Sequence, residues 1–297
     1  MIYTLSVAPS VDYHFDLDDT VHPNAILRGH HARFSPGGKG INVSRVLCSL
    51  GVGTKALGFW AGRNGKWLTD MLAKEGVPSD FINIEGETRI NVKVNSRDGE
   101  TAFNLDGPII LQEHLEMLYE KLDRLEASDI LVLGGSIGRS SKDLYKKIIQ
   151  RYGQKFLCCL DAKGEALKEG VKAKPFLIKP NKEEFEDLIG RKVGIEEVPE
   201  LGKSVQEKYG IQYVLISLGA DGAVLVTPAG IYKDRYTEFS KSVVSTVGAG
   251  DTLLAAFLSK IARGETPVNA LHFGLKTAAL TCYLGRIPTK EDIEENR

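Results

Sequence analysis

The sequence predicts an α/β protein in which helices cover a mostly parallel β-sheet. The first observation is that helical stretches alternate, from about residue 115 onward, with short apolar runs: Ile130 to Leu133, Phe156 to Leu160, Phe176 to Ile178 and Tyr213 to Ile216. This alternation is typical of strand–helix units whose strands pair in parallel. The second observation is that polar residues follow these runs, where open α/β sheets bind ligands: Ser136, Asp161, Lys179, Asn181 and Ser217.

The chain begins with the apolar segment Met-Ile-Tyr-Thr-Leu-Ser-Val, which we expect to form an edge or first strand. It lacks the basic flank and the long apolar core of a signal peptide, and no stretch of the sequence approaches the length of a membrane span. We therefore expect a cytoplasmic protein without a membrane partner. The 297 residues suit one large α/β domain, so a single domain over residues 1–297 is predicted.

The charge of the chain is balanced, because 38 lysine and arginine residues face 39 acidic residues and the formal net charge is −1. No block of like charge resembles a nucleic-acid-binding surface, so small molecules are the expected ligands. The adjacent His30 and His31 have no third ligand at metal spacing. The cysteines also lack metal-binding spacing and are expected to be free thiols: Cys48, Cys158, Cys159 and Cys282.

A small second sheet is predicted in the first third of the chain. Residues Thr88 to Asn95 alternate between apolar and polar side chains, and an Asp-Gly turn leads into Thr101 to Leu105, which predicts a hairpin. Its first strand presents Arg89, Asn91 and Lys93 on one face. A solvated face explains this pattern as well. Alternatively, the hairpin and a hydrophilic stretch before it form a lid, with strands drawn from about 12–35 and 88–105.

The segment Pro36-Gly37-Gly38-Lys39-Gly40 is a glycine turn that opens a predicted helix. Apolar residues at helical spacing follow it, and Gly51 supplies a stop signal. The glycines permit close approach of a ligand to the backbone, and Asn42 in the first helical turn can form hydrogen bonds with sugar hydroxyls. The segment is neither a P-loop nor a dinucleotide-binding fingerprint.

Two further turns follow predicted strands. Asn181 and Glu184 lie one helical turn apart, so they suit a helix capping box and equally the water shell of Mg²⁺. The turn from Ser217 to Gly222 carries a hairpin signal and has room for a nucleotide.

The segment Thr246-Val-Gly-Ala-Gly-Asp251 places an aspartate at the start of an apolar helical run. Free backbone N–H groups of Gly248, Ala249 and Gly250 at a helix N-terminus can hold phosphate oxygens. A carboxylate beside them can accept a proton from a hydroxyl group, as phosphoryl transfer requires. A plain N-cap is the alternative interpretation for this turn alone.

Taken in order, these motifs resemble the ribokinase-like (PfkB) family of carbohydrate kinases, in its branch of 1-phosphofructokinases and tagatose-6-phosphate kinases. The motifs are Gly37 to Asn42, Thr88 to Lys93, Phe103 to Pro108, Lys179 to Glu184 and Thr246 to Asp251. The resemblance implies a three-layer α/β/α fold with a β-sheet lid, and phosphoryl transfer from ATP with Mg²⁺. It also implies that a homodimer can form through the lid.

The resemblance implies roles for residues at matching positions. Asp251 is the expected base, and Gly248, Ala249 and Gly250 form the anion hole. Asn181 and Glu184 organise Mg²⁺. The nucleotide is expected along Lys179, Asn181, Ser217, Gly219, Gly222 and Thr246. The sugar phosphate is expected at Asp12, Gly38, Lys39, Asn42, Arg89, Lys93, Asn104 and Arg139.

Three cations suit a phosphate already present on the substrate, and these are Arg89, Lys93 and Arg139. The sequence therefore predicts an ATP-dependent kinase that converts fructose 1-phosphate to fructose 1,6-bisphosphate. A tagatose-6-phosphate kinase is the alternative within the class, and a catalytically silent sugar-phosphate sensor is the alternative from another class.

Overall fold

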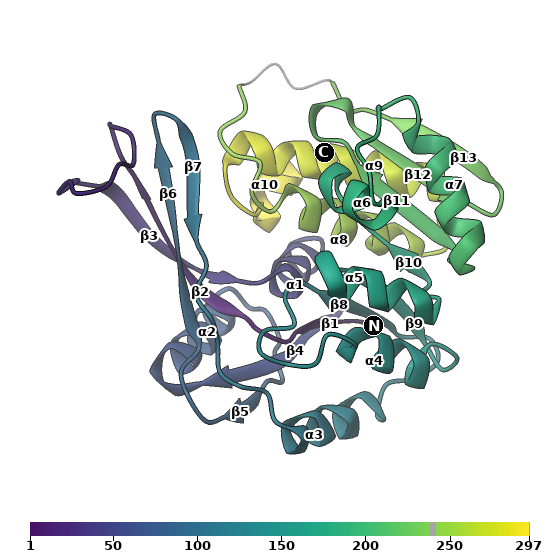
Figure 1. Cartoon of the computed structure of the whole chain (residues 1–297), viewed down its shortest axis with the longest axis horizontal. Helices are drawn as coiled ribbons and strands as arrows, with labels where there is room; N and C mark the ends of the chain where they lie inside the picture. Colours follow the sequence, from purple (N-terminus) through teal and green to yellow (C-terminus); the bar gives the residue numbers. More distant parts are fainter. Residues whose placement is uncertain (238–241, 297) are drawn as a thin grey trace.

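The computed structural model of the chain describes residues 1–237 and 242–296. Its larger sheet has nine strands in the order β13-β12-β11-β10-β9-β8-β1-β4-β5 (Figure 1). The strands are β1 (Ile2–Ser6), β4 (Thr54–Ala61), β5 (Ile82–Ile84), β8 (Ile130–Gly134), β9 (Leu157–Asp161), β10 (Leu177–Ile178), β11 (Tyr213–Ser217), β12 (Ala223–Thr227) and β13 (Gly230–Asp234). Pairing is parallel from β5 to β11 and antiparallel at β12 and β13, so the mostly parallel sheet is confirmed.

The N-terminal strand lies inside this sheet. Ile2 of β1 pairs with Thr54 of β4 on one side and with Ile130 of β8 on the other. The segment is the first strand of the chain, as one of the two expectations had it, whereas the alternative of an edge position is wrong. Burial gives the reason, because Ile2 and Leu5 are almost completely buried. Only an interior strand of a covered sheet buries apolar side chains on both faces.

Helices cover both faces of the large sheet. Alternate residues of β8 point to opposite faces, since Leu131 and Leu133 pack in one apolar cluster and Ile130 and Val132 in another. The first cluster includes residues of α3 (Gln112–Leu122), α4 (Leu144–Tyr152), α5 (Gly164–Gly170), α6 (Lys182–Ile189) and α7 (Val198–Tyr209). The second includes residues of α1 (Lys39–Ser49), α8 (Ala249–Ile261) and α9 (Pro267–Leu284). The three-layer α/β/α fold is thereby confirmed.

The remaining helices are shorter or lie at the margins. They are α2 (Gly62–Lys74), α10 (Lys290–Glu295) and the 3-10 turns η1 (Val171–Ala173) and η2 (Gly219–Asp221).

None of the helices in the described ranges combines the length and hydropathy that a membrane crossing requires. The thiols at Cys48, Cys158, Cys159 and Cys282 are free, as expected.

A second sheet of four strands, here called the outer sheet, stands beside the main body (left in Figure 1). Its strands are β2 (Ser10–Asp16), β3 (His30–Gly37), β6 (Arg89–Ser96) and β7 (Gly99–Phe103), in the order β3-β2-β6-β7. The predicted hairpin is present as the antiparallel pair β6–β7, and β2 joins it through a parallel pairing with β6. The two stretches predicted for a lid thus share one sheet.

Candidate active site

Two cavities meet at the turn that precedes α8. One, of about 1340 Å³, lies beyond the carboxyl ends of β10 and β11, and we call it the strand-end cavity. The other, of about 1260 Å³, is lined by the outer sheet and the C-terminal segment, and we call it the outer-sheet cavity. Thr246 and Gly248 line both cavities. The glycine turn singled out in the sequence therefore lies where two ligands can meet.

The strand-end cavity gathers all the residues predicted for the nucleotide. Parallel pairing of Ile178 with Val214 aligns the ends of β10 and β11, and Asn181 forms a further bridge with Ser217. Residues that follow the two strands consequently lie side by side. The predicted residues that line this cavity are Lys39, Lys179, Asn181, Glu184, Ser217, Gly219, Gly222, Thr246, Gly248, Ala249, Gly250 and Asp251.

The turn itself depends on Gly248, the N-cap of α8, whose φ of 79° lies in the left-handed region. A Cβ at this position would lie 2.9 Å from a side-chain carbon of Ile287. The N–H of Ala249 donates to the carbonyl of Thr246 at 3.2 Å, so this donor belongs to the turn. Of the three backbone donors predicted for an anion hole, the N–H of Ala249 is therefore already used within the turn.

Asp251 lies in the first turn of α8 and is only 7 % exposed. The side-chain amide of Asn42, on α1, donates to its carboxylate at 2.7 Å. Burial and the negative charge of Asp161 raise the pKa of Asp251 to about 6, while Lys39, Lys179 and the Asn42 hydrogen bond oppose the rise. A carboxylate with a pKa of this size is ionised at neutral pH and can still accept a proton, which suits a general base.

Asp161, at the end of β9, holds two lysines against this site. Its carboxylate lies 2.8 Å from Lys39 Nζ and 3.2 Å from Lys179 Nζ, and the residue is fully buried. Burial raises the pKa of Asp161, but the two ammonium groups outweigh it and lower the pKa overall. The cluster places positive charge beside Asp251, as the transfer of an anionic phosphoryl group requires.

This role of Asp161 was not predicted from the sequence, where its position after a strand was the only signal. Lys179 also differs from expectation in its surroundings, because it is 3 % exposed and its ammonium would lie 3.2 Å from a Cβ at Gly250. Lys179 therefore lines the strand-end cavity beside the glycine turn, with little exposure to solvent.

Asn181 and Glu184 form the capping box of α6. The Asn181 side chain accepts from the Glu184 N–H at 2.7 Å, and Glu184 accepts from the Asn181 N–H at 3.0 Å. The other oxygen of Glu184 accepts from Lys39 at 3.1 Å. Both residues line the strand-end cavity. Their side-chain oxygens have further lone pairs that can accept hydrogen bonds from the water molecules around a cation. The donor set fits Mg²⁺, which binds oxygen ligands and retains several waters.

Asp12 lines the outer-sheet cavity and is 5 % exposed. Its carboxylate accepts hydrogen bonds from Ser10 at 2.6 Å, from Asn91 at 3.2 Å and from Lys93 at 2.6 Å. Burial raises the pKa of Asp12, but Lys93 and these hydrogen bonds lower it overall. Asp12 is therefore an ionised acceptor that faces Asn42 across the same cavity.

His14 lines the same cavity and was missed in the sequence. Burial and the nearby Lys93 and Arg33 lower the pKa of its imidazole to about 4, so the ring is neutral. It lies 3.0 Å from the Ser35 hydroxyl. Strand alternation is the one signal that could have found it, because Asp12 and His14 point to the same face of β2.

The three cations predicted for a substrate phosphate have different surroundings. Lys93 lines the outer-sheet cavity but is paired with Asp12. Arg89 donates to the carbonyls of Leu105 and Ala8, at 3.1 and 2.8 Å, and among the described residues its buried Nε has no hydrogen-bond partner. Arg139 is exposed.

Some predicted sugar ligands do not line either cavity within the described residues, and these are Gly38, Arg89, Asn104 and Arg139. Gly38 is the N-cap of α1, and Asn104 is exposed beyond β7. The backbone N–H of Leu105 donates to Asn91 at 3.2 Å, so the segment after β7 does return to the polar face of β6.

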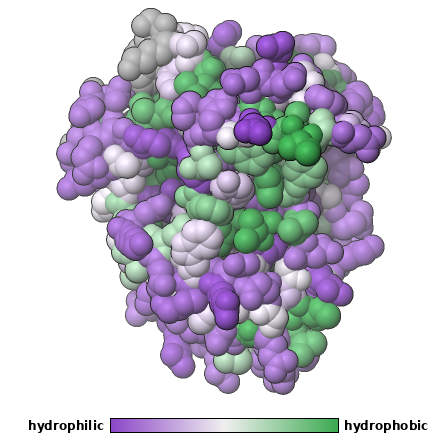
Figure 2. Space-filling view, turned by 90° about the vertical axis from the view of Figure 1, so that its left-hand side faces the viewer, coloured by the Kyte–Doolittle hydropathy of each residue, from purple (hydrophilic) through white to green (hydrophobic). Residues whose placement is uncertain are grey.

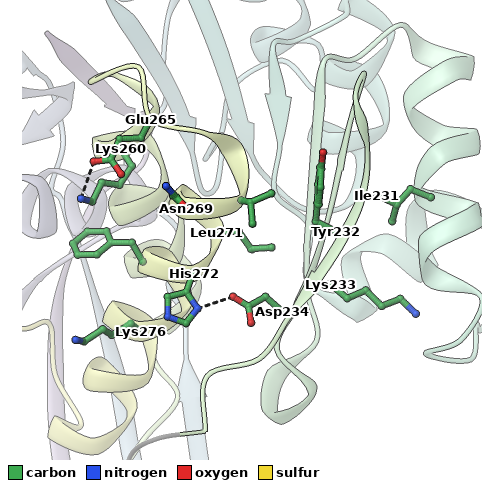
Figure 3. A pocket seen from close by; sticks show the side chains of 12 residues that line it. Ile231, Tyr232, Lys233, Asp234, Lys260, Glu265, Asn269, Leu271, His272 and Lys276 are labelled. Atoms are coloured by element: carbon green, nitrogen blue, oxygen red, sulfur yellow. Dashed lines mark hydrogen bonds and ion pairs between the residues drawn. The ribbon is translucent and has the colours of Figure 1, made fainter.

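A third cavity, of about 670 Å³, lies between β13 and α9 (Figure 3). Several of its polar side chains contact one another, since His272 lies 2.9 Å from Asp234 and Lys260 lies 2.9 Å from Glu265. Within the described chain it shares no lining residue with the other two cavities. It is therefore separate from the candidate active site.

The fold and the site together define a ribokinase-like sugar kinase. The chain belongs to the pfkB family of carbohydrate kinases, whose family model matches residues 7–285. It is 37 % identical over 300 residues to the 1-phosphofructokinase of Bacillus subtilis (strain 168), covering 99 % of this chain and 97 % of that protein. It is 32 % identical over 292 residues to the D-tagatose-1-phosphate kinase of Bacillus licheniformis, covering 95 % and 93 %.

A solved structure shows the same fold over the whole chain. The chain matches phosphofructokinase-2 from Escherichia coli in complex with substrates and products with a TM-score of 0.91 and 28 % identity, covering 99 % of this chain and 97 % of that one. The tetrameric inhibited form of the same protein matches with a TM-score of 0.89 and 27 % identity, with the same coverage.

Proposed function

We propose that the chain transfers a phosphoryl group from ATP to a ketohexose phosphate, and that the preferred acceptor is fructose 1-phosphate. The observation that carries the proposal is the position of Asp251, a buried carboxylate with a pKa of about 6 that lines the strand-end cavity and accepts a hydrogen bond from Asn42, which lines the outer-sheet cavity. The strand-end cavity suits the nucleotide, and the outer-sheet cavity suits the sugar. The similarity to the 1-phosphofructokinase of Bacillus subtilis supports this choice of acceptor.

In the proposed reaction Asp251 accepts the proton of the 6-hydroxyl group of fructose 1-phosphate. The oxygen forms a bond to the γ-phosphorus of ATP, and the bond from that phosphorus to the β,γ-bridging oxygen breaks, which releases ADP. The N–H groups of Gly248 and Gly250 and the ammonium groups of Lys39 and Lys179 stabilise charge on the transferred group.

Asp12 is the proposed acceptor for sugar hydroxyl groups. Its ion pair with Lys93 keeps it ionised, and its hydrogen bonds with Ser10 and Asn91 hold it in one orientation. Asn42 donates to Asp251 and so links the sugar side of the site to the base. Arg89 and Arg139 remain predicted ligands of the phosphate that the acceptor already carries, together with Lys93.

Asn181 and Glu184 are the residues proposed to hold Mg²⁺, through the oxygens that line the strand-end cavity. The bound cation supplies charge neutralisation on the nucleotide phosphates.

Tagatose 1-phosphate is the second candidate acceptor, because one relative is named D-tagatose-1-phosphate kinase. It differs from the tagatose 6-phosphate considered from the sequence in carrying its phosphate at the same end as fructose 1-phosphate. The intact Asp251, Asn181 and Glu184 argue against a silent sensor.

The proposal is tested by ADP release with Mg·ATP against fructose 1-phosphate, tagatose 1-phosphate, fructose 6-phosphate, tagatose 6-phosphate and ribose at matched concentrations. The highest kcat/KM is expected with fructose 1-phosphate. A preference for either 6-phosphate would refute the proposed orientation of the sugar. Turnover of ribose alone would refute a phosphate site, and binding without any turnover would favour the sensor.

We also propose a homodimer through the outer sheet. Tyr13 and Phe34 stack with ring centroids 4.4 Å apart, and Phe34 lies 4.6 Å from Trp67, yet Phe34 is 45 % exposed and Trp67 38 % exposed. Figure 2 shows hydrophobic residues gathered among hydrophilic ones on the side of the molecule that carries this sheet. Exposed apolar groups beside unpaired strand edges favour burial against a second copy.

Sedimentation equilibrium tests the dimer. We expect Phe34→Asp to shift the chain toward the monomer, with Met117→Asp as the control, since Met117 is an exposed apolar residue on α3. A wild-type chain that stays monomeric at high concentration would refute the dimer.

A further inference from the structure

Asp16, His30 and His31 form a compact cluster on the outer sheet, and none of the three is among the residues proposed to bind substrate or to take part in the transfer. One ligand atom from each residue lies within 4.8 Å of the others. The Nδ1 atom of His31 is 3.2 Å from the Asp16 carboxylate. Asp16 precedes His31 by fifteen residues, so sequence spacing gave no hint of this third group. The antiparallel pairing of β2 with β3 brings Asp16 directly opposite His30.

An irregularity in β3 explains how two consecutive histidines reach the same carboxylate. Neighbouring residues on a regular strand point to opposite faces of the sheet. The register between β2 and β3 shifts between His14 and Asp16, and His31 has a φ of 51°, which is unusual for a residue other than glycine. Such a bulge redirects one side chain. The two imidazole centroids consequently lie only 4.6 Å apart.

We propose that Asp16, His30 and His31 bind a first-row transition-metal dication, and that Zn²⁺ is the preferred ion. Two imidazole nitrogens and one carboxylate oxygen are a donor set that suits Zn²⁺ and that Mg²⁺ does not favour. The three ligand atoms reach one ion through small side-chain rotations. Asp16 and His31 are partly or fully solvent-accessible, so their side chains have room to rotate.

Neighbouring groups suit such a site. The Asp18 carboxylate lies 3.7 Å from His30 Nε2 and can supply a fourth ligand, with water as the alternative. The Asn95 side chain donates to the second oxygen of Asp16 at 3.3 Å, which orients the carboxylate from outside. The three proposed ligands come from the end of β2 and the start of β3, and Asn95 of β6 supports one of them, so a bound ion would link β2 to β3.

The site differs from the proposed Mg²⁺ position in both place and chemistry. Asp16 and His31 line the outer-sheet cavity, whereas Asn181 and Glu184 line the strand-end cavity. A Zn²⁺ ion bound by Asp16 and His30 would hold together the two ends of the connection formed by residues 17–29. The inference does not depend on the identity of the sugar or on the kinase activity.

Equilibrium dialysis with Zn²⁺, in the presence of saturating Mg²⁺, is the direct test. We expect the whole chain to bind one Zn²⁺ that His30→Ala, His31→Ala and Asp16→Asn each weaken by at least about tenfold. His22→Ala is the matched control, because His22 is an exposed histidine of the same connection that lies beside the Thr20 carbonyl. It should bind Zn²⁺ as the wild type does.

Co²⁺ absorption provides a second measurement with an independent readout. A nitrogen and oxygen donor set gives visible d–d bands without the sulfur-to-cobalt charge-transfer band, and His31→Ala should lose those d–d bands. Equal Zn²⁺ affinity in wild type and all three variants would overturn the proposal. A charge-transfer band from a cysteine thiolate, or an equal loss of affinity in His22→Ala, would overturn it as well.

Discussion

Replacement of Asp251 by Asn tests the electrostatics and the chemistry of the proposed base in one variant. Burial and Asp161 raise the pKa of Asp251 from 3.8 to about 6. Each pKa unit corresponds to about 1.4 kcal/mol, so the ionised carboxylate destabilises the folded chain by on the order of 3 kcal/mol. Asn keeps an oxygen that can accept the hydrogen bond from Asn42 and removes the charge.

The sign of the pH dependence follows from the raised pKa. The folded chain holds the carboxyl proton of Asp251 more tightly than the unfolded chain. The free energy of unfolding therefore falls as pH rises from about 4 to about 6, and the full destabilisation by the ionised carboxylate is present above pH 6. Asp251→Asn should therefore be more stable than the wild type in urea at about pH 8, by up to about 3 kcal/mol. The difference should nearly vanish at about pH 4. Turnover should fall by about 10²–10⁴-fold or more.

Asp161→Asn is the matched control, because its carboxylate is also buried but has a lowered pKa. It leaves Lys39 and Lys179 without their shared partner and should destabilise the chain at neutral pH. Equal stability of Asp251→Asn and wild type at pH 8 would refute the electrostatic reasoning. Turnover of Asp251→Asn within a few-fold of wild type would refute the base.

Three further substitutions test other parts of the site. Lys39→Met removes a positive charge that lowers the pKa of Asp251, so the acidic limb of the pH profile of kcat/KM should move to higher pH. An unmoved limb would contradict the electrostatic effect of Lys39 on Asp251. Asp12→Asn breaks the ion pair with Lys93 and should raise the KM for the sugar at least about tenfold, while the KM for ATP stays constant. A parallel rise in both KM values would place Asp12 outside the sugar site. Gly248→Ala forces a left-handed φ on alanine and should lower the free energy of unfolding by about 1–2 kcal/mol in urea; an unchanged midpoint would show that the turn adopts another φ.

The sequence predicts those parts of the molecule that local patterns control. The predicted apolar runs coincide with the strands β8, β9, β10 and β11 to within one residue at each end. Lys179, Asn181 and Ser217 lie at the ends of β10 and β11, so their convergence is a consequence of parallel pairing. Gly51, with a φ of 68°, ends α1 where the stop signal was expected.

Contacts between distant segments could not be predicted in this way. Asp161 meets Lys39 across 122 residues of sequence, and neither residue carries a local sign of the other. The guanidinium of Arg89, predicted to bind a phosphate, donates to the carbonyls of Leu105 and Ala8, and neither of these contacts could be predicted from its strand. The side of a strand on which a residue lies can be predicted from alternation, whereas the partner that it meets depends on packing.

The hydrogen bond between Asn42 and Asp251 joins residues that are 209 positions apart in the chain. During synthesis on the ribosome, the base therefore emerges long after its partner, when most of the polypeptide has already left the exit tunnel. A partly synthesised or C-terminally truncated chain that ends before α8 contains all nine described strands of the large sheet but lacks Asp251, the proposed base. With the proposed role of Asp251, enzymatic activity thus requires both the synthesis of α8 and its correct assembly against α1.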